Sequence, residues 1–172
     1  MRKNSVAGDR ARYWLWRPAL TGKALVIGYG NPLRGDDGIG PAAASAFANE
    51  GTIDHTRAIV CHQLTPELAE CMAAADLVVF VDATVNIGPG TVAVREIHGA
   101  AQVSSGLAHT STPAALLVLA RELYGRLPDA FLVTVGVSSL ALGEGLSDAA
   151  AAALPVAIAA IRCLLSKRLA AH

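Results

Sequence analysis

The sequence predicts an α/β fold, a single three-layer α/β/α domain around a mostly parallel five-stranded sheet. Its 172 residues correspond to one domain that is long enough to bury a core. The composition is 53% hydrophobic and only 16% charged, which argues against disorder. Apolar runs of strand length alternate with helical patterns, and this alternation is typical of parallel sheets covered by helices on both faces.

The first half of the chain contains three candidate strands and two candidate helices. "KALVIGYG" (23–30) is a continuous apolar run that ends in glycines, as expected for a strand buried on both faces. "DGIGPAAASAFANE" (37–50) predicts a helix that tolerates a proline near its first turn, and "RAIVCHQ" (57–63) a short strand. Residues 65–75 predict a helix with Thr65 as N-cap and Pro66 at its first position. "DLVVFVDA" (76–83) follows as a second buried strand.

The second half continues the alternation. "TVAVREI" (91–97) alternates as a half-exposed strand does, and "AFLVTVGV" (130–137) is the last apolar strand. Between them, "STPAALLVLARELYG" (111–125) is an amphipathic pattern with another Thr-Pro start. Ser147 is positioned to cap a long alanine-rich C-terminal helix.

The longest apolar run, Ala149 to Ile161, indicates a core helix and not a membrane span. Its 13 residues are fewer than the roughly 18 that a span requires, and Pro155 interrupts them. The formal net charge is zero, from 14 basic and 14 acidic residues, so no overall field attracts nucleic acid or an anionic membrane. We therefore expect a soluble protein with no nucleic-acid or membrane partner.

The N-terminal segment and the cysteines indicate where the domain begins and in which compartment the protein is found. Residues 1–22 carry a basic start but no apolar stretch long enough for a secretory signal, so we expect an N-terminal extension before a domain at 23–172. The three cysteines show no CxxC spacing and indicate reduced thiols. These features predict a cytoplasmic protein. We also expect a monomer.

The stretch "LVIGYGNPLRGDDGIG" (25–40) resembles the start of a nucleotide-binding fold, but its second half argues against phosphate. Gly28 and Gly30 match a dinucleotide fingerprint, whereas Leu33 replaces its third glycine. Asp36 and Asp37 then place two carboxylates where a helix N-terminus would hold a pyrophosphate. One of the two aspartates is expected to cap the helix, and the other is a candidate for chemistry. We expect Asp36 to serve local structure and Asp37 to be the candidate for chemistry. The glycines are expected to leave room for the backbone of a substrate.

Acidic and imidazole side chains recur at the other strand-to-helix connections. Asp82 ends the apolar run "LVVFVDA", where a carboxylate requires a partner or a metal, and His109 precedes the helix that starts near Thr112. Together with Asp37 they form a mixed nitrogen and oxygen set suited to nickel or zinc, with positions left open for a substrate. Each of the three also has a purely structural explanation, as a cap, a bonded buried acid or a histidine near a helix start.

His62 is the competing histidine, because it also follows a predicted strand. Its neighbour Cys61 suggests a thiol–imidazole pair. Adjacent strand residues point to opposite faces, however, so the two would not readily form a nucleophile and its base. The chain also lacks a G-x-S-x-G elbow and an H-E-x-x-H helix, which leaves serine-hydrolase and zincin interpretations without their motifs.

Five ordered blocks resemble the nickel–iron hydrogenase maturation endopeptidases: "LVIGYGNPLRGDDGIGP", "HQLTPELAE", "VVFVDATVNIGPGTV", "HTSTPAALLVLA" and "VGVSSLALGEGLS". The most specific is G-x-G-N-x-L-x-x-D-[DE]-G-x-G, matched from Gly28 to Gly40. The resemblance implies a twisted, phosphorylase/hydrolase-like sheet between helices. It also implies an enzyme that removes the C-terminal extension of the hydrogenase large-subunit precursor after nickel is loaded.

Carried over by motif, the resemblance implies that Asp37, Asp82 and His109 contact nickel held by the substrate, with no tightly bound cofactor of the enzyme's own. Many members have glutamate at the position of Asp37, and residues before Lys23 have no counterpart in the usual pattern.

Two alternative functions stay open. One is a metal-independent aspartic-type peptidase with Asp37 and Asp82 as its dyad, and the other is a checkpoint protein that binds the precursor without cutting it.

Overall fold

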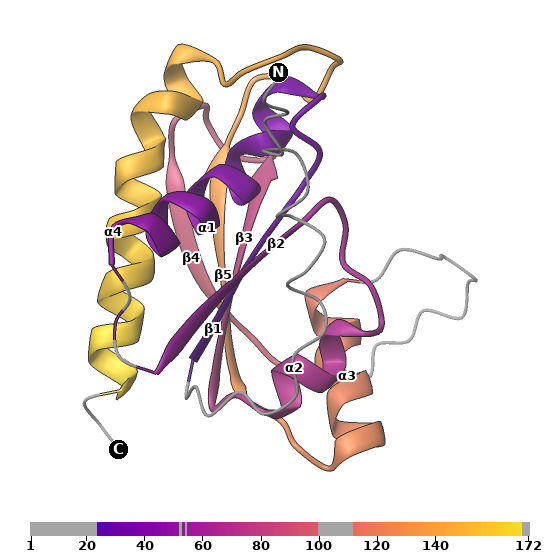
Figure 1. Ribbon diagram of the computed structural model, residues 1–172. Helices are drawn as coiled ribbons and strands as arrows, with labels where there is room; N and C mark the ends of the chain where they lie inside the picture. The colour runs from indigo at the N-terminus through magenta and orange to yellow at the C-terminus, as the bar shows by residue number, and fades with distance from the viewer. Residues whose placement is uncertain (1–23, 52, 54, 100–111, 170–172) are drawn as a thin grey trace, which may run out of the picture.

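A twisted five-stranded sheet forms the centre of the protein (Figure 1). The computed structural model describes residues 24–51, 53, 55–99 and 112–169, and the strand count refers to these residues. The strands are β1 (Ala24–Tyr29), β2 (Thr56–Cys61), β3 (Leu77–Thr84), β4 (Val92–Ile97) and β5 (Asp129–Gly136). They lie in the order β2-β1-β3-β5-β4, with only β4 antiparallel to its neighbour. The predicted mostly parallel sheet is confirmed.

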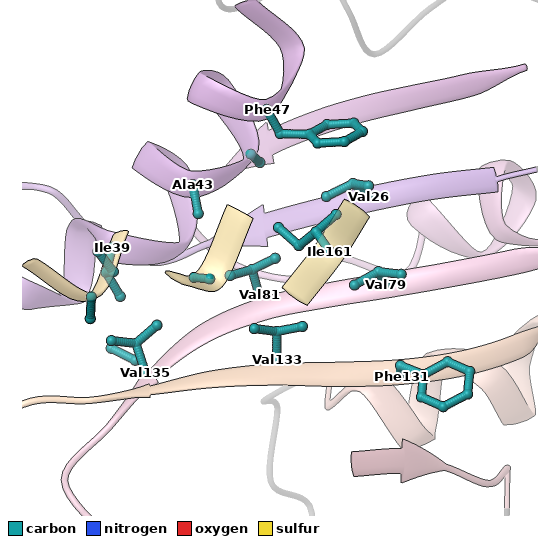
Figure 2. Packing of buried hydrophobic residues seen from close by; sticks show 14 of the residues in the cluster. Val26, Ile39, Ala43, Phe47, Val79, Val81, Phe131, Val133, Val135 and Ile161 are labelled. Atoms are coloured by element: carbon teal, nitrogen blue, oxygen red, sulfur yellow. The ribbon is translucent and has the colours of Figure 1, made fainter. Parts of the chain in front are cut away.

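Helices cover both faces of the sheet, which gives the three predicted layers. Helices α1 (Ile39–Asn49) and α4 (Asp148–Leu169) lie on one face, and α2 (Leu68–Ala73) and α3 (Pro113–Tyr124) lie on the other (Figure 1). Alternate residues of each strand contribute to the two cores. Figure 2 shows the first core, in which Val26, Val79 and Val133 of three adjacent strands pack with Ile161 of α4.

Two predicted helix starts are wrong by a few residues, for physical reasons. The segment expected as a helix from residue 37 begins as a 3-10 turn, η2 (Gly35–Gly38), and α1 starts only at Ile39 with Gly38 as N-cap and no side-chain cap. Neither aspartate caps α1. The helix expected from Thr65 starts at Leu68, because the Leu68 N–H bonds to the Thr65 carbonyl in a preceding turn.

Two other caps form as predicted. Ala115 N–H donates to Thr112 Oγ1 at 3.2 Å, with Pro113 in the first turn of α3. Ala150 N–H donates to Ser147 Oγ at 3.3 Å at the start of α4. A local side-chain bond therefore stabilises the first turn of each of these two helices.

Helix α4 is longer than the apolar run suggested, since its 22 residues continue through Pro155. Pro155 and Ala151 are exposed, so water can satisfy the carbonyl that the proline leaves unbonded. By length and composition, Asp148–Arg168 could also cross a membrane, and it is the one such helix among the described residues. One face of it packs in the core through Ala153, Ala157 and Ile161, as expected for a half-buried helix.

Glycines bring the start of α1 against the centre of the sheet. A Cβ at Gly28 would collide with the carbonyl oxygen of Gly40, and a Cβ at Gly40 with the carbonyls of Tyr29 and Val81. Gly30 has a φ of 139°, and the Asp37 carbonyl occupies the space of its missing side chain. The expectation that these glycines leave room for a substrate backbone is therefore wrong at Gly28 and Gly30, because the chain's own backbone fills that space.

Candidate functional site

The predicted acidic residues lie at the carboxyl ends of β1 and β3, the two central strands. The chain leaves β1 toward β2 on one side and later crosses to β3 on the other, so the strand order reverses between β1 and β3. Ligand sites of open α/β sheets form at such a switch point. Asp37 follows β1 through the loop 30–36, and Asp82 is the sixth residue of β3. The structure thus brings two of the three predicted site residues to this edge.

Asp82 is half-buried and held at both carboxylate oxygens. Its Oδ2 accepts a hydrogen bond from the Tyr29 hydroxyl at 2.7 Å, and its Oδ1 accepts one from the Ala83 N–H at 2.8 Å. Asp82 follows Val78 and Phe80 on the sheet face covered by α2 and α3. Its position in the strand therefore directs the carboxylate to that face of the carboxyl edge.

The environment of Asp82 favours the protonated acid. Burial raises its pKa to about 6, and the negative charge of Asp37 adds to this effect. The bonds from Tyr29 and Ala83 act in the opposite direction, because they stabilise the carboxylate, but they do not cancel the cost of burial. The pKa of Tyr29 is raised by burial and by the adjacent Asp82, so its hydroxyl stays protonated and remains a donor.

Asp37 is half-buried and has a single described hydrogen bond to its carboxylate. Asn31 N–H donates to its Oδ2 at 2.9 Å, which fixes the side chain across the turn. The charge of Asp37 adds to the rise in the pKa of Asp82, so the two carboxylates are near enough to interact. Two neighbouring carboxylates attract a divalent cation when both are ionised, and otherwise share a proton.

Asp36, the neighbouring aspartate, has a structural role. It is only 6% exposed, and it accepts bonds from the Ser147 N–H at 2.6 Å and from the Ser147 hydroxyl at 2.8 Å. The expectation that one of the two aspartates serves local structure is confirmed, although the helix it supports is α4 and not α1. Asp36 is thus committed to the fold, and Asp37 is the one free for chemistry.

Further contacts tie the loop after β1 to the loop between β5 and α4. Gly35 N–H donates to the Gly143 carbonyl at 2.7 Å, and Gly143 N–H donates to the Leu33 carbonyl at 3.1 Å. The Arg34 guanidinium donates through Nε to the Leu140 carbonyl at 2.9 Å. These bonds hold the backbone on both sides of Asp36 and so fix the turn that presents Asp37.

His109, the third predicted site residue, lies outside the described residues. The described chain resumes at Thr112, and α3 ends at Tyr124, a few residues before β5 starts at the amino edge of the sheet. Helix α3 therefore begins toward the carboxyl edge, on the same face as Asp82. This topology is consistent with the prediction for His109, which stays a prediction.

Cys61 and His62 do not form a catalytic pair. Burial raises the pKa of the Cys61 thiol to about 11, so it is protonated and weakly nucleophilic at neutral pH. Cys61 packs against the α2/α3 core, whereas His62 is exposed beyond the end of β2. The alternation expected from strand geometry accounts for this separation.

The described residues contain no group of three or more histidine, cysteine or acidic side chains arranged to hold a metal ion. Asp37 and Asp82 supply at most two ligands, too few for a closed metal site. Such a pair is suited to complete the coordination of an ion that arrives with other ligands.

Tyr29 is the site residue that sequence reasoning missed. It occupied the variable position of the G-x-G motif, where no role was assigned to its side chain. A signal was present, however. Tyr29 is the last residue of β1 and Asp82 lies near the end of the adjacent strand β3, and a buried tyrosine hydroxyl usually has a hydrogen-bond partner.

Comparisons with known proteins identify a group of solved structures with this fold. The hydrogenase maturating endopeptidase HybD from E. coli matches with a TM-score of 0.69 and 24% identity, over 85% of this chain and 93% of that one. The hydrogenase 2 maturation peptidase of a Thaumarchaeota archaeon matches with a TM-score of 0.63 and 25% identity, over 83% and 97%. The NiFe hydrogenase maturation protease HycI from Thermococcus kodakarensis matches with a TM-score of 0.64 and 23% identity, over 78% and 87%.

No family model and no curated sequence matches the chain. The matching structures confirm the fold class and the resemblance seen in the five sequence blocks. All three are named as peptidases of hydrogenase maturation, and each match spans more than three quarters of both chains.

Replacement of Asp36 tests the division of roles between the adjacent aspartates. We expect Asp36→Ala to lower the free energy of unfolding by about 1 to 3 kcal/mol, because two donors of Ser147 lose their buried acceptor. Asp37→Ala is the matched control and removes one half-buried bond. Urea unfolding of both variants measures the difference. Equal losses would show that Asp36 has no special structural role.

The raised pKa of Asp82 predicts how stability changes with pH. The folded protein binds the Asp82 proton more tightly than the unfolded chain, so this residue's contribution to stability is greatest below pH 4 and is lost as the pH rises to about 6. We expect Asp82→Asn to be more stable than the wild type at pH 7, by about 1 to 3 kcal/mol, with no gain at pH 4. Urea unfolding at the two pH values measures this. A gain that is the same at both values would contradict it.

Proposed function

We propose that this chain is a hydrogenase maturation endopeptidase that removes the C-terminal extension of a nickel–iron hydrogenase large-subunit precursor after nickel insertion. Asp37, Asp82 and His109 would contact the nickel that the precursor carries. The observation that supports this most strongly is the position of two electrostatically coupled carboxylates at the switch point of the sheet. The fold of named maturation proteases supports the reaction class.

Recognition of a metal held by the substrate accounts for the incomplete ligand set. Asp37 and Asp82 provide oxygen ligands, and the proposed imidazole of His109 provides a nitrogen ligand of the kind that nickel accepts. A complete site of the enzyme's own would hold a metal without the precursor and would lose the ability to distinguish loaded from unloaded substrate. We therefore propose that the enzyme holds no tightly bound cofactor.

The hydrolysis requires a water molecule, a polarised carbonyl and a proton acceptor. Water adds to the scissile carbonyl carbon, the C–N bond breaks, and the released amine takes up a proton. In this proposal, a carboxylate of the pair receives the proton of the water and passes it to the amine. Nickel bound by the precursor can polarise the carbonyl when the two partners dock.

A metal-independent aspartic-type peptidase is the second candidate, and one observation favours it. Burial raises the pKa of Asp82 to about 6, and the charge of Asp37 adds to the effect, so the Asp82 carboxyl can hold a proton close to neutral pH. This is the arrangement of dyads in which one carboxyl acts as acid and the other as base. In this candidate function, nickel and His109 would not be required.

Cellular context and assembly are also part of the proposal. The three free cysteines suit a reducing compartment, and we propose a cytoplasmic monomer whose partner is the precursor, with no nucleic acid or membrane involved. Helix α4 packs against the sheet as a core helix does.

A cleavage assay with nickel-loaded and nickel-free precursor separates the two enzymatic candidates. We expect the wild type to cleave only the loaded precursor. Asp37→Ala, Asp82→Ala and His109→Ala should each reduce the rate by about a hundredfold, because each would lose a metal contact. A mass decrease of the large subunit on a denaturing gel measures cleavage.

His62→Ala is the matched control, since this exposed histidine lies at the same edge of the sheet without a described role. Equal cleavage of both precursor forms, with His109→Ala fully active, would contradict metal recognition and favour the aspartic dyad. Binding without cleavage by the wild type would contradict both enzymatic candidates.

A further inference from the structure

The hydroxyl of Tyr29 contacts one of the two carboxylates directly, although the proposed hydrolysis assigns it no role. Gly28 of β1 is paired with Val81 of β3, so the next residues, Tyr29 and Asp82, are neighbours across the two central strands. Both lie on the face covered by α2 and α3. The 2.7 Å hydrogen bond between them is therefore set by the register of the sheet.

The aromatic ring of Tyr29 is held in place independently of that bond. It packs edge-to-face on Phe80 with 6.5 Å between the ring centroids, and Phe80 is fully buried in the core. Tyr29 is also paired with Cys61 on its other side, as part of the β1–β2 ladder. The hydroxyl consequently has a fixed position, and the Asp82 carboxylate must orient toward it.

The two bonds to Asp82 restrict how it can meet a metal. Tyr29 binds Oδ2 and Ala83 N–H binds Oδ1, so rotation of the carboxylate would break both bonds. The lone pairs that remain on the two oxygens point in directions set by the protein before any substrate arrives. Groups that orient a ligating carboxylate in this way typically change metal affinity by about 10- to 100-fold when removed.

We propose that Tyr29 is a positioning residue that orients Asp82 toward the nickel carried by the precursor. The inference rests on the proposed function and adds a determinant of metal recognition to it. Without the hydroxyl, Asp82 can rotate about its side-chain bonds. Productive docking of the nickel-loaded precursor then includes the entropic cost of ordering the Asp82 side chain. The effect should appear in recognition of the loaded substrate more than in the chemical step.

Tyr29→Phe tests this, because it removes the hydroxyl and keeps the ring that packs on Phe80. With the nickel-loaded precursor, we expect KM to rise about 10- to 100-fold while kcat changes less than about threefold. A second readout uses Ni²⁺ alone. The N–H groups of Asn31 and Ala83 bond to the two carboxylates, so Ni²⁺ bound there should broaden their amide NMR signals by its paramagnetism. We expect this broadening in Tyr29→Phe to require at least about tenfold more Ni²⁺ than in the wild type.

Tyr124→Phe is the matched control, because Tyr124 is an exposed tyrosine of α3 away from the carboxylates. Unchanged KM and unchanged Ni²⁺ response in Tyr29→Phe, with active wild type, would overturn the inference and leave the proposed function standing. A lower kcat with unchanged KM and Ni²⁺ response would also overturn it. If the wild type leaves the loaded precursor uncut, the proposed function fails and the inference fails with it.

Discussion

The two hydrogen bonds between Asp36 and Ser147 are the constraint that fixes the turn carrying Asp37. They join the loop after the first strand to the start of the last helix, more than a hundred positions later in the chain. Because Asp36 is buried in this contact, the next residue must point away from it, and that residue is Asp37. The contact thus decides which of two identical adjacent side chains is available for chemistry.

The second constraint is electrostatic. Asp82 is half-buried beside another acid, and the fold stabilises its charge only in part, through Tyr29 and Ala83. A cation would offset the remaining unfavourable energy of the Asp82 carboxylate, so the acidic pair favours an incoming positive charge. Functional sites commonly retain such locally unfavourable groups, at a cost in stability. The proposed recognition of nickel uses this preference of the two carboxylates for a positive charge.

Much of the fold was predictable from sequence because both faces of the central strands are buried. A continuous apolar run such as "LVIGYG" has few alternatives to a central parallel strand. The start of α1 was misplaced because the bonds of Asp36 to Ser147 and the packing of Gly40 on β1 are tertiary effects that no local pattern records. Asp37 and Asp82 were found from their positions at strand ends, whereas the role of Tyr29 depends on the register between β1 and β3.

Contact between these carboxylates and a metal held by another protein can be measured by nickel X-ray absorption. Spectra would be recorded for the nickel-loaded precursor alone, with the wild type, and with Asp82→Asn. The account predicts that the wild type adds light-atom ligands at about 2.0 to 2.2 Å, the range for oxygen and nitrogen donors, and that Asp82→Asn adds fewer. A nickel spectrum that stays the same when the wild type binds the precursor would contradict the account.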